Sequence, residues 1–161
     1  GGSTVHGVGE GPGDDVRPRL SGASQGPLLL VWHRMSRTGF DLLAVPLSRD
    51  GAPAGGAVRL ARFDAAVRDA SALLLPDGEL LLAWARRSGE ETVIEARLGN
   101  RPPLVLGTAP GTGPVALRVE LDEHGGPRVA WEWDGETSAS VEGDVEGCWR
   151  SPQYDRRPPR P

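Results

Sequence analysis

Lysine is missing from this chain of 161 residues, and arginine supplies all 18 of its basic residues. Isoleucine and asparagine occur once each, as Ile94 and Asn100. We interpret this usage as the codon bias of a GC-rich genome rather than as selection for a function. It favours a bacterial origin.

Cysteine and long apolar runs are also scarce. The single Cys148 excludes a disulfide within the chain and a metal centre built from several cysteines. No apolar run approaches the roughly 18 residues of a membrane helix. The sequence therefore predicts a soluble protein without a membrane partner, and it leaves open whether that protein is cytoplasmic or secreted.

What the chain has in abundance is glycine and proline, with 23 and 15 residues, and these argue against long helices. A length of 161 residues is normally one domain. Within it Trp32, Trp84 and Trp131 lie 52 and 47 residues apart, and each has a glycine six residues before it. This spacing indicates an internal repeat.

Each copy of the repeat alternates apolar and polar residues on both sides of its tryptophan. A period of two is typical of a strand with one buried face, and the glycine turns on either side favour a β-hairpin. Further apolar segments predict additional strands at residues 58–63, 72–75, 104–108 and 115–121. Each copy then has four strands.

These units divide the chain into three parts. Residues 1–16 are expected to form a flexible leader, in which residues 3–8 are a candidate outer strand for the third copy. Residues 17–148 are expected to form the repeat domain, with copies at about residues 17–63, 64–110 and 111–148. Residues 149–161 form a tail rich in proline and arginine, which is expected to be extended or disordered.

With these spacings, close to the roughly 40 to 50 residues of four-stranded propeller blades, the chain resembles a bacterial β-propeller of the general kelch, WD or sialidase-like kind. The resemblance covers about residues 17–147. It implies an all-β fold of about three antiparallel four-stranded sheets in a propeller-like arrangement. Closed propellers have about four to eight blades. Three arrangements are therefore open: part of a larger propeller, a ring completed by copies of the chain, or an open set of three sheets.

Three residues are candidates for a ligand site. Arg34 and Arg86 both follow their tryptophan by two residues, and Trp133 occupies that position in the third copy. Guanidinium groups bind carboxylate or sulfate bidentately, and the resemblance to sialidase-like propellers implies a site for an acidic sugar. Trp133 is a candidate for an exposed contact. The competing interpretation is that the two arginines pair with neighbouring acidic side chains.

A second pattern places Glu142, Asp144 and Glu146 on one face of one strand. Three carboxylates could bind a hard cation such as Ca²⁺, but they are more typical of a solvated strand face. We predict no metal, no cofactor and no catalytic residue from this pattern or from the three histidines.

The predicted function is a non-catalytic binding or scaffold module of β-propeller type, which presents its loops or a channel to a protein or carbohydrate partner. This prediction depends on analogy of fold. The alternative is a glycan-binding or glycan-hydrolysing propeller of the sialidase-like kind. No nucleic-acid partner is expected, whereas a homo-oligomer and blades from a longer chain both remain open.

Overall fold

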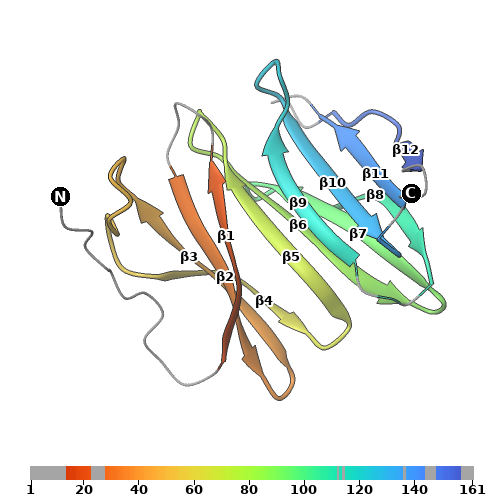
Figure 1. Ribbon diagram of the computed structural model, residues 1–161, viewed down its shortest axis with the longest axis horizontal. Coiled ribbons are helices and arrows are strands. Elements are labelled where there is room, and N and C mark those ends of the chain that lie inside the picture. The colour runs from red at the N-terminus through yellow and green to blue at the C-terminus, as the bar shows by residue number, and fades with distance from the viewer. Residues whose placement is uncertain are drawn as a thin grey trace, which may run out of the picture.

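The computed structural model describes residues 14–22, 28–111, 113, 115–135, 137–143 and 148–156. Within these residues the chain forms twelve β-strands and no helix. The strands make three four-stranded antiparallel sheets, and neighbouring strands in each sheet follow one another along the chain. Figure 1 shows the three sheets in chain order, from the orange first sheet to the blue third sheet. The predicted all-β fold is confirmed, and the arrangement is consistent with part of a propeller.

The first sheet consists of β1 (Asp15–Gly22), β2 (Leu28–Ser36), β3 (Gly39–Leu47) and β4 (Val58–Asp64). The second consists of β5 (Val67–Leu74), β6 (Leu80–Ser88), β7 (Glu91–Leu98) and β8 (Leu104–Pro110). The third consists of β9 (Val115–Leu121), β10 (Pro127–Trp133), β11 (Thr137–Glu142) and β12 (Gln153–Arg156).

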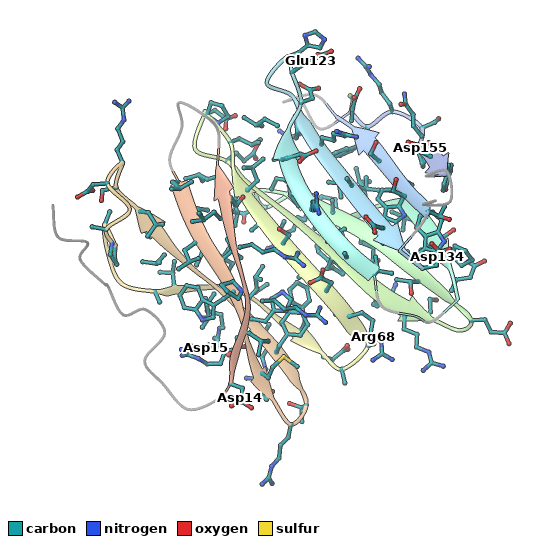
Figure 2. All side chains as sticks on the ribbon, in the orientation of Figure 1. Asp14, Asp15, Arg68, Glu123, Asp134 and Asp155 are labelled. Atoms are coloured by element: carbon teal, nitrogen blue, oxygen red, sulfur yellow. The ribbon has the colours of Figure 1, made fainter. Side chains whose placement is uncertain are left out.

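The second sheet is covered on both faces, because side chains of β6 alternate between its two neighbours. Leu82 packs toward the first sheet, in a cluster with Val31 and Leu42. Leu81 and Ala83 pack toward the third sheet, in a cluster with Trp131 and Val141. A strand buried on both faces reads as a continuous apolar run, as β6 does. Figure 2 shows side chains filling the spaces between the ribbons.

Close packing between the second and third sheets requires a glycine on β8. A Cβ atom at Gly107 would lie 2.8 Å from Cζ2 of Trp131. The Trp131 residue is only 1% exposed. The tryptophan ring is rigid and enclosed, so a side chain at this position would have to displace it. The repeat position of Trp131 is therefore a core position.

The third sheet extends beyond the limit expected from the repeat. Its outer strand is β12, which comes from the tail and pairs with β11 from Thr137↔Arg156 to Ser140↔Gln153. Tyr154 of β12 meets the ring of Trp133 edge to face, with centroids 6.3 Å apart. Of the two alternatives predicted for the tail, residues 153–156 adopt the extended one, because this aromatic contact and the strand pairing hold them in a β-strand. Residues 3–8 lie outside the described residues.

Two further boundaries differ by a few residues from the expected ones. β1 begins at Asp15, inside the segment predicted to be a leader, and β5 begins at Val67 rather than at residue 72. The apolar pattern of β5 is interrupted by Arg68 and by Asp69, which is why the sequence pattern did not reveal its first half. Those two residues prove to be important for the site.

Candidate functional site

The two arginines selected from the sequence each have a carboxylate partner on their own sheet. On the first sheet, Nε and Nη2 of Arg34 donate to the two carboxylate oxygens of Asp15 at 2.8 and 2.9 Å. The hydrogen bond from Arg34 lowers the pKa of Asp15 below its usual value. These two groups form a bidentate pair at the surface.

Arg86 of the second sheet is held in a similar way. Its Nε lies 3.1 Å from Oε2 of Glu95, and Nε1 of Trp84 donates to the same oxygen at 2.7 Å. The hydrogen bond from Arg86 is the main cause that lowers the pKa of Glu95. For both arginines, the structure agrees with pairing to neighbouring acids.

Trp133 is buried rather than exposed, with 9% of its surface accessible. Its ring packs in the cluster between the second and third sheets and against Tyr154. The prediction of an exposed contact is therefore wrong, because β12 supplies a partner that the repeat pattern did not include. Arg34, Arg86 and Trp133 lie on three different sheets.

The structure brings other residues together where the first strands of the sheets meet. β1, β5 and β9 contact one another, and we call the side of the molecule that they form the axial side. At its centre Asp69 of β5 has a fully buried side chain. Its Oδ2 accepts hydrogen bonds from Nη2 of Arg19 at 2.8 Å and from the backbone N–H of Leu117 at 2.9 Å. One carboxylate thus joins all three sheets.

The other oxygen of Asp69 is also occupied. Its Oδ1 accepts from Nη1 of Arg17 at 3.3 Å and from the N–H of Ala70 at 3.0 Å. Arg19 also donates to the carbonyl of Leu117. Four N–H groups therefore donate to this buried carboxylate, two of them from the guanidinium groups of Arg17 and Arg19. Because its lone pairs are already engaged, the carboxylate is a structural centre.

His33 of β2 completes the group. Its Nε2 lies 2.9 Å from the carbonyl oxygen of Ala70, so this nitrogen carries the proton and donates. Burial lowers the pKa of His33, against the opposing influence of that hydrogen bond and of the charge on Asp69. The imidazole is therefore neutral at neutral pH. It stacks on Phe40, with ring centroids 4.3 Å apart.

Irregular strand pairing places Arg17 and Arg68 on the axial side. The register of β1 with β2 shifts between Val16 and Arg19, and the register of β5 with β6 shifts between Val67 and Asp69. Each shift inserts one extra residue, as in a β-bulge, and bulges re-aim side chains. Arg17 has φ of 55°, a left-handed conformation that is uncommon for a residue with a side chain.

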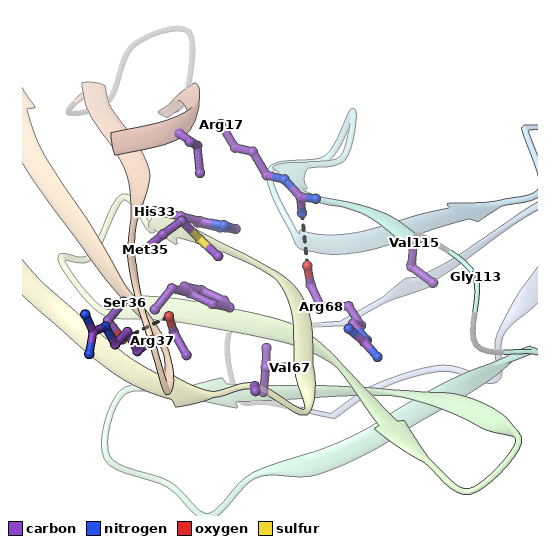
Figure 3. A pocket seen from close by; sticks show the side chains of 13 residues that line it. Arg17, His33, Met35, Ser36, Arg37, Val67, Arg68, Gly113 and Val115 are labelled. Atoms are coloured by element: carbon purple, nitrogen blue, oxygen red, sulfur yellow. Dashed lines mark hydrogen bonds between the residues drawn. The ribbon is translucent and has the colours of Figure 1, made fainter. Parts of the chain in front are cut away.

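Two cavities flank the buried carboxylate. The first cavity has a volume of about 760 Å³ and is lined by Arg17, His33, Phe40 and Arg68, among others. Figure 3 shows Arg17 reaching toward the backbone carbonyl of Arg68, to which its Nη1 donates at 3.0 Å. His33 lies beside them, and Arg37 lies at the turn after β2.

The second cavity has a volume of about 750 Å³ and differs in charge. Arg17 and Arg19 line it together with the carboxylates of Asp69, Glu132 and Asp134. Trp133 also lines it, whereas neither Arg34 nor Arg86 lines either of the two cavities. The three residues selected from the sequence are therefore not brought together at one cavity.

Of the three acidic residues in the pattern on the third sheet, the structure describes only Glu142. Glu142 pairs with Arg150 at 3.2 Å, while Asp144 and Glu146 lie outside the described residues. In the part of the chain that the structure describes, no group of three or more His, Cys, Asp or Glu side chains could hold a metal ion. Within these same residues there is no helix that is long and apolar enough to cross a membrane.

Comparison of the chain with protein-family models and with curated proteins gives no match. The axial residues were missed in the sequence because they lie on the first strand of each copy, whereas the candidate residues were selected from the hairpin that contains the tryptophan. One signal was present, since Asp69 is a lone carboxylate in a segment that continues as an apolar strand. A carboxylate in such a place is buried only when it has partners.

Proposed function

We propose that this chain is a non-catalytic binding module of β-propeller type that holds its ligand on the axial side. One observation carries the proposal: β1, β5 and β9 build a hydrogen-bonded centre around Asp69, with a cavity on either side. Ligand sites are typically concave, between about 300 and 1,000 Å³, and supported by residues that are already fixed.

The arrangement favours binding over acid–base catalysis. Asp69 has both oxygens engaged, and His33 uses its Nε2 proton on a backbone carbonyl. A general acid or base must be within hydrogen-bond reach of the substrate, and these groups face each other instead. The glycan-directed alternative required Arg34, Arg86 and Trp133 at one pocket, and it is not favoured because neither arginine lines the cavity that Trp133 lines.

The proposal is tested by mapping where ligands bind. We would record amide chemical shifts of the ¹⁵N-labelled chain during titration with a panel of anionic, cationic and neutral fragments and short oligosaccharides. We expect the shifted amides to gather on the axial side, at residues such as Val16, Arg68 and Val115. Shifts gathered instead on the outer strands β4 and β8 would overturn the proposal.

A further inference from the structure

We infer that the first cavity binds an organic carboxylate, that is, a carboxylate group carried on an apolar body. The inference rests on the proposed binding function and adds the chemical class of the ligand. It follows from the charge of the cavity, from its apolar wall and from the position of its arginines.

The first cavity has an excess of positive charge. Arg17 and Arg19 share the single negative charge of Asp69, so one positive charge of that group is not compensated. Arg68 and Arg37 also line the cavity and add two more, because no carboxylate within the described residues pairs with either guanidinium group. His33 adds none while it is neutral. The chain as a whole has a net charge of −4, so this local excess is opposite in sign to the protein average.

Donors are available as well as charge. Both hydrogen bonds that Arg17 makes within the described residues come from Nη1. A guanidinium group has five N–H donors in a planar fork, so Nε and Nη2 can serve a ligand. Arg17 is fixed by these bonds and by its bulge, which reduces the entropy lost when it binds an anion.

The wall of the first cavity favours a ligand with an apolar body. Phe40, Val67 and Val115 line it and are themselves almost fully buried, at 3, 8 and 5% exposure. Met35 lines it too and is 42% exposed, so an apolar ligand could cover its side chain. An inorganic anion would leave the exposed part of the Met35 side chain in contact with water.

The second cavity supplies a contrast within the same molecule. It also contains arginines, but Glu132 and Asp134 line it with Asp69. Carboxylates at that site repel an anion. Of these two cavities, an anionic ligand is therefore expected only in the first.

The test compares three small probes on the full chain by amide chemical shifts. Benzoate carries a carboxylate on an apolar ring, benzamide has the same shape without the charge, and inorganic phosphate has charge without the ring. We expect benzoate to shift residues around the first cavity and to bind about tenfold more tightly than benzamide, which corresponds to one charged hydrogen bond. Phosphate is expected to bind more weakly than benzoate.

Two arginine variants test whether benzoate binds in the first cavity. Arg68→Gln should weaken benzoate binding about tenfold, since it removes the charge of Arg68 from the cavity. Arg62→Gln is the matched control, because Arg62 is an exposed arginine of β4 that does not line the first cavity. It should change benzoate affinity by less than about twofold. Amide spectra of each variant establish that the fold is kept.

Every other result of these binding experiments would contradict one specific part of the proposal. Equal binding of benzoate and benzamide at the axial side would overturn the carboxylate assignment and leave the proposed binding function standing. Phosphate binding as tightly as benzoate would overturn the requirement for an apolar body. Equal effects of Arg68→Gln and Arg62→Gln would show only general attraction of charge. Shifts that avoid the axial side for every probe and fragment would overturn the binding function itself.

Discussion

Replacing Asp69 with asparagine should destabilise the protein more than any other change of a single charge described above. The side chain is fully buried and accepts hydrogen bonds from Arg17, Arg19, Ala70 and Leu117. Asparagine keeps one carbonyl oxygen but presents an NH₂ group where Asp69 has its second acceptor. At least one of those donors would then face another donor.

The magnitude follows from the burial of the partners. Removing one member of a buried ion pair costs about 3–5 kcal/mol. Arg17 and Arg19 are 48 and 30% exposed, so water can partly solvate the guanidinium groups that lose their partner. We therefore expect Asp69→Asn to lower the free energy of unfolding by about 2–4 kcal/mol. That is a large part of the roughly 5–15 kcal/mol of a typical domain.

Urea denaturation, followed by tryptophan fluorescence and far-UV circular dichroism, measures this loss. The matched control is Glu142→Gln, which breaks an exposed pair with Arg150 and should cost less than about 1 kcal/mol. A value for Asp69→Asn within about 0.5 kcal/mol of the wild type would refute the argument, since surface substitutions produce changes of that size.

A double-mutant cycle measures the interaction between Asp69 and Arg19 separately from the other effects of each substitution. Arg19→Gln alone leaves the buried carboxylate with fewer donors, and it should also destabilise the protein. Combined with Asp69→Asn, the loss should fall short of the sum by at least about 0.5 kcal/mol, because the two residues interact directly. Losses that add would contradict the direct coupling.

Three further predictions concern single positions. Gly107→Ala should lower stability by about 1–3 kcal/mol in urea denaturation, because its Cβ would strike the ring of Trp131; an unchanged midpoint would contradict this. Because the pKa of His33 is lowered in the folded protein, the unfolded chain takes up a proton near pH 6.5 and the folded chain does so only at lower pH. The free energy of unfolding should therefore fall as the pH drops from 7 toward 5, and it should fall less steeply in His33→Gln. Equal slopes for the two proteins would refute that assignment. Arg34→Gln should raise the pKa of Asp15 toward its ordinary value, as measured by carbon-detected NMR titration, and no change would mean that the pair is not formed in solution.

The candidate site shows what kind of residue a repeat pattern overlooks. Arg34 and Arg86 were selected because they recur at equivalent positions, and such recurrence reflects the equivalent environment of two sheets. Asp69 and Arg17 recur nowhere in the third sheet, whose first two strands pair without a register shift. A site made from the differences between repeats is invisible to a search for their similarities.

The sequence by itself determined the local architecture. Alternation with a period of two, glycine turns and the spacing of Trp32, Trp84 and Trp131 predicted four-stranded antiparallel sheets, because strand formation depends on neighbouring residues. Only the tertiary structure decided that β12 completes the third sheet and covers Trp133. It also decided that Arg17, Arg19 and Asp69 meet, although about 50 residues separate the arginines from the carboxylate. That meeting depends on how the sheets pack against one another, and no short-range pattern encodes such packing.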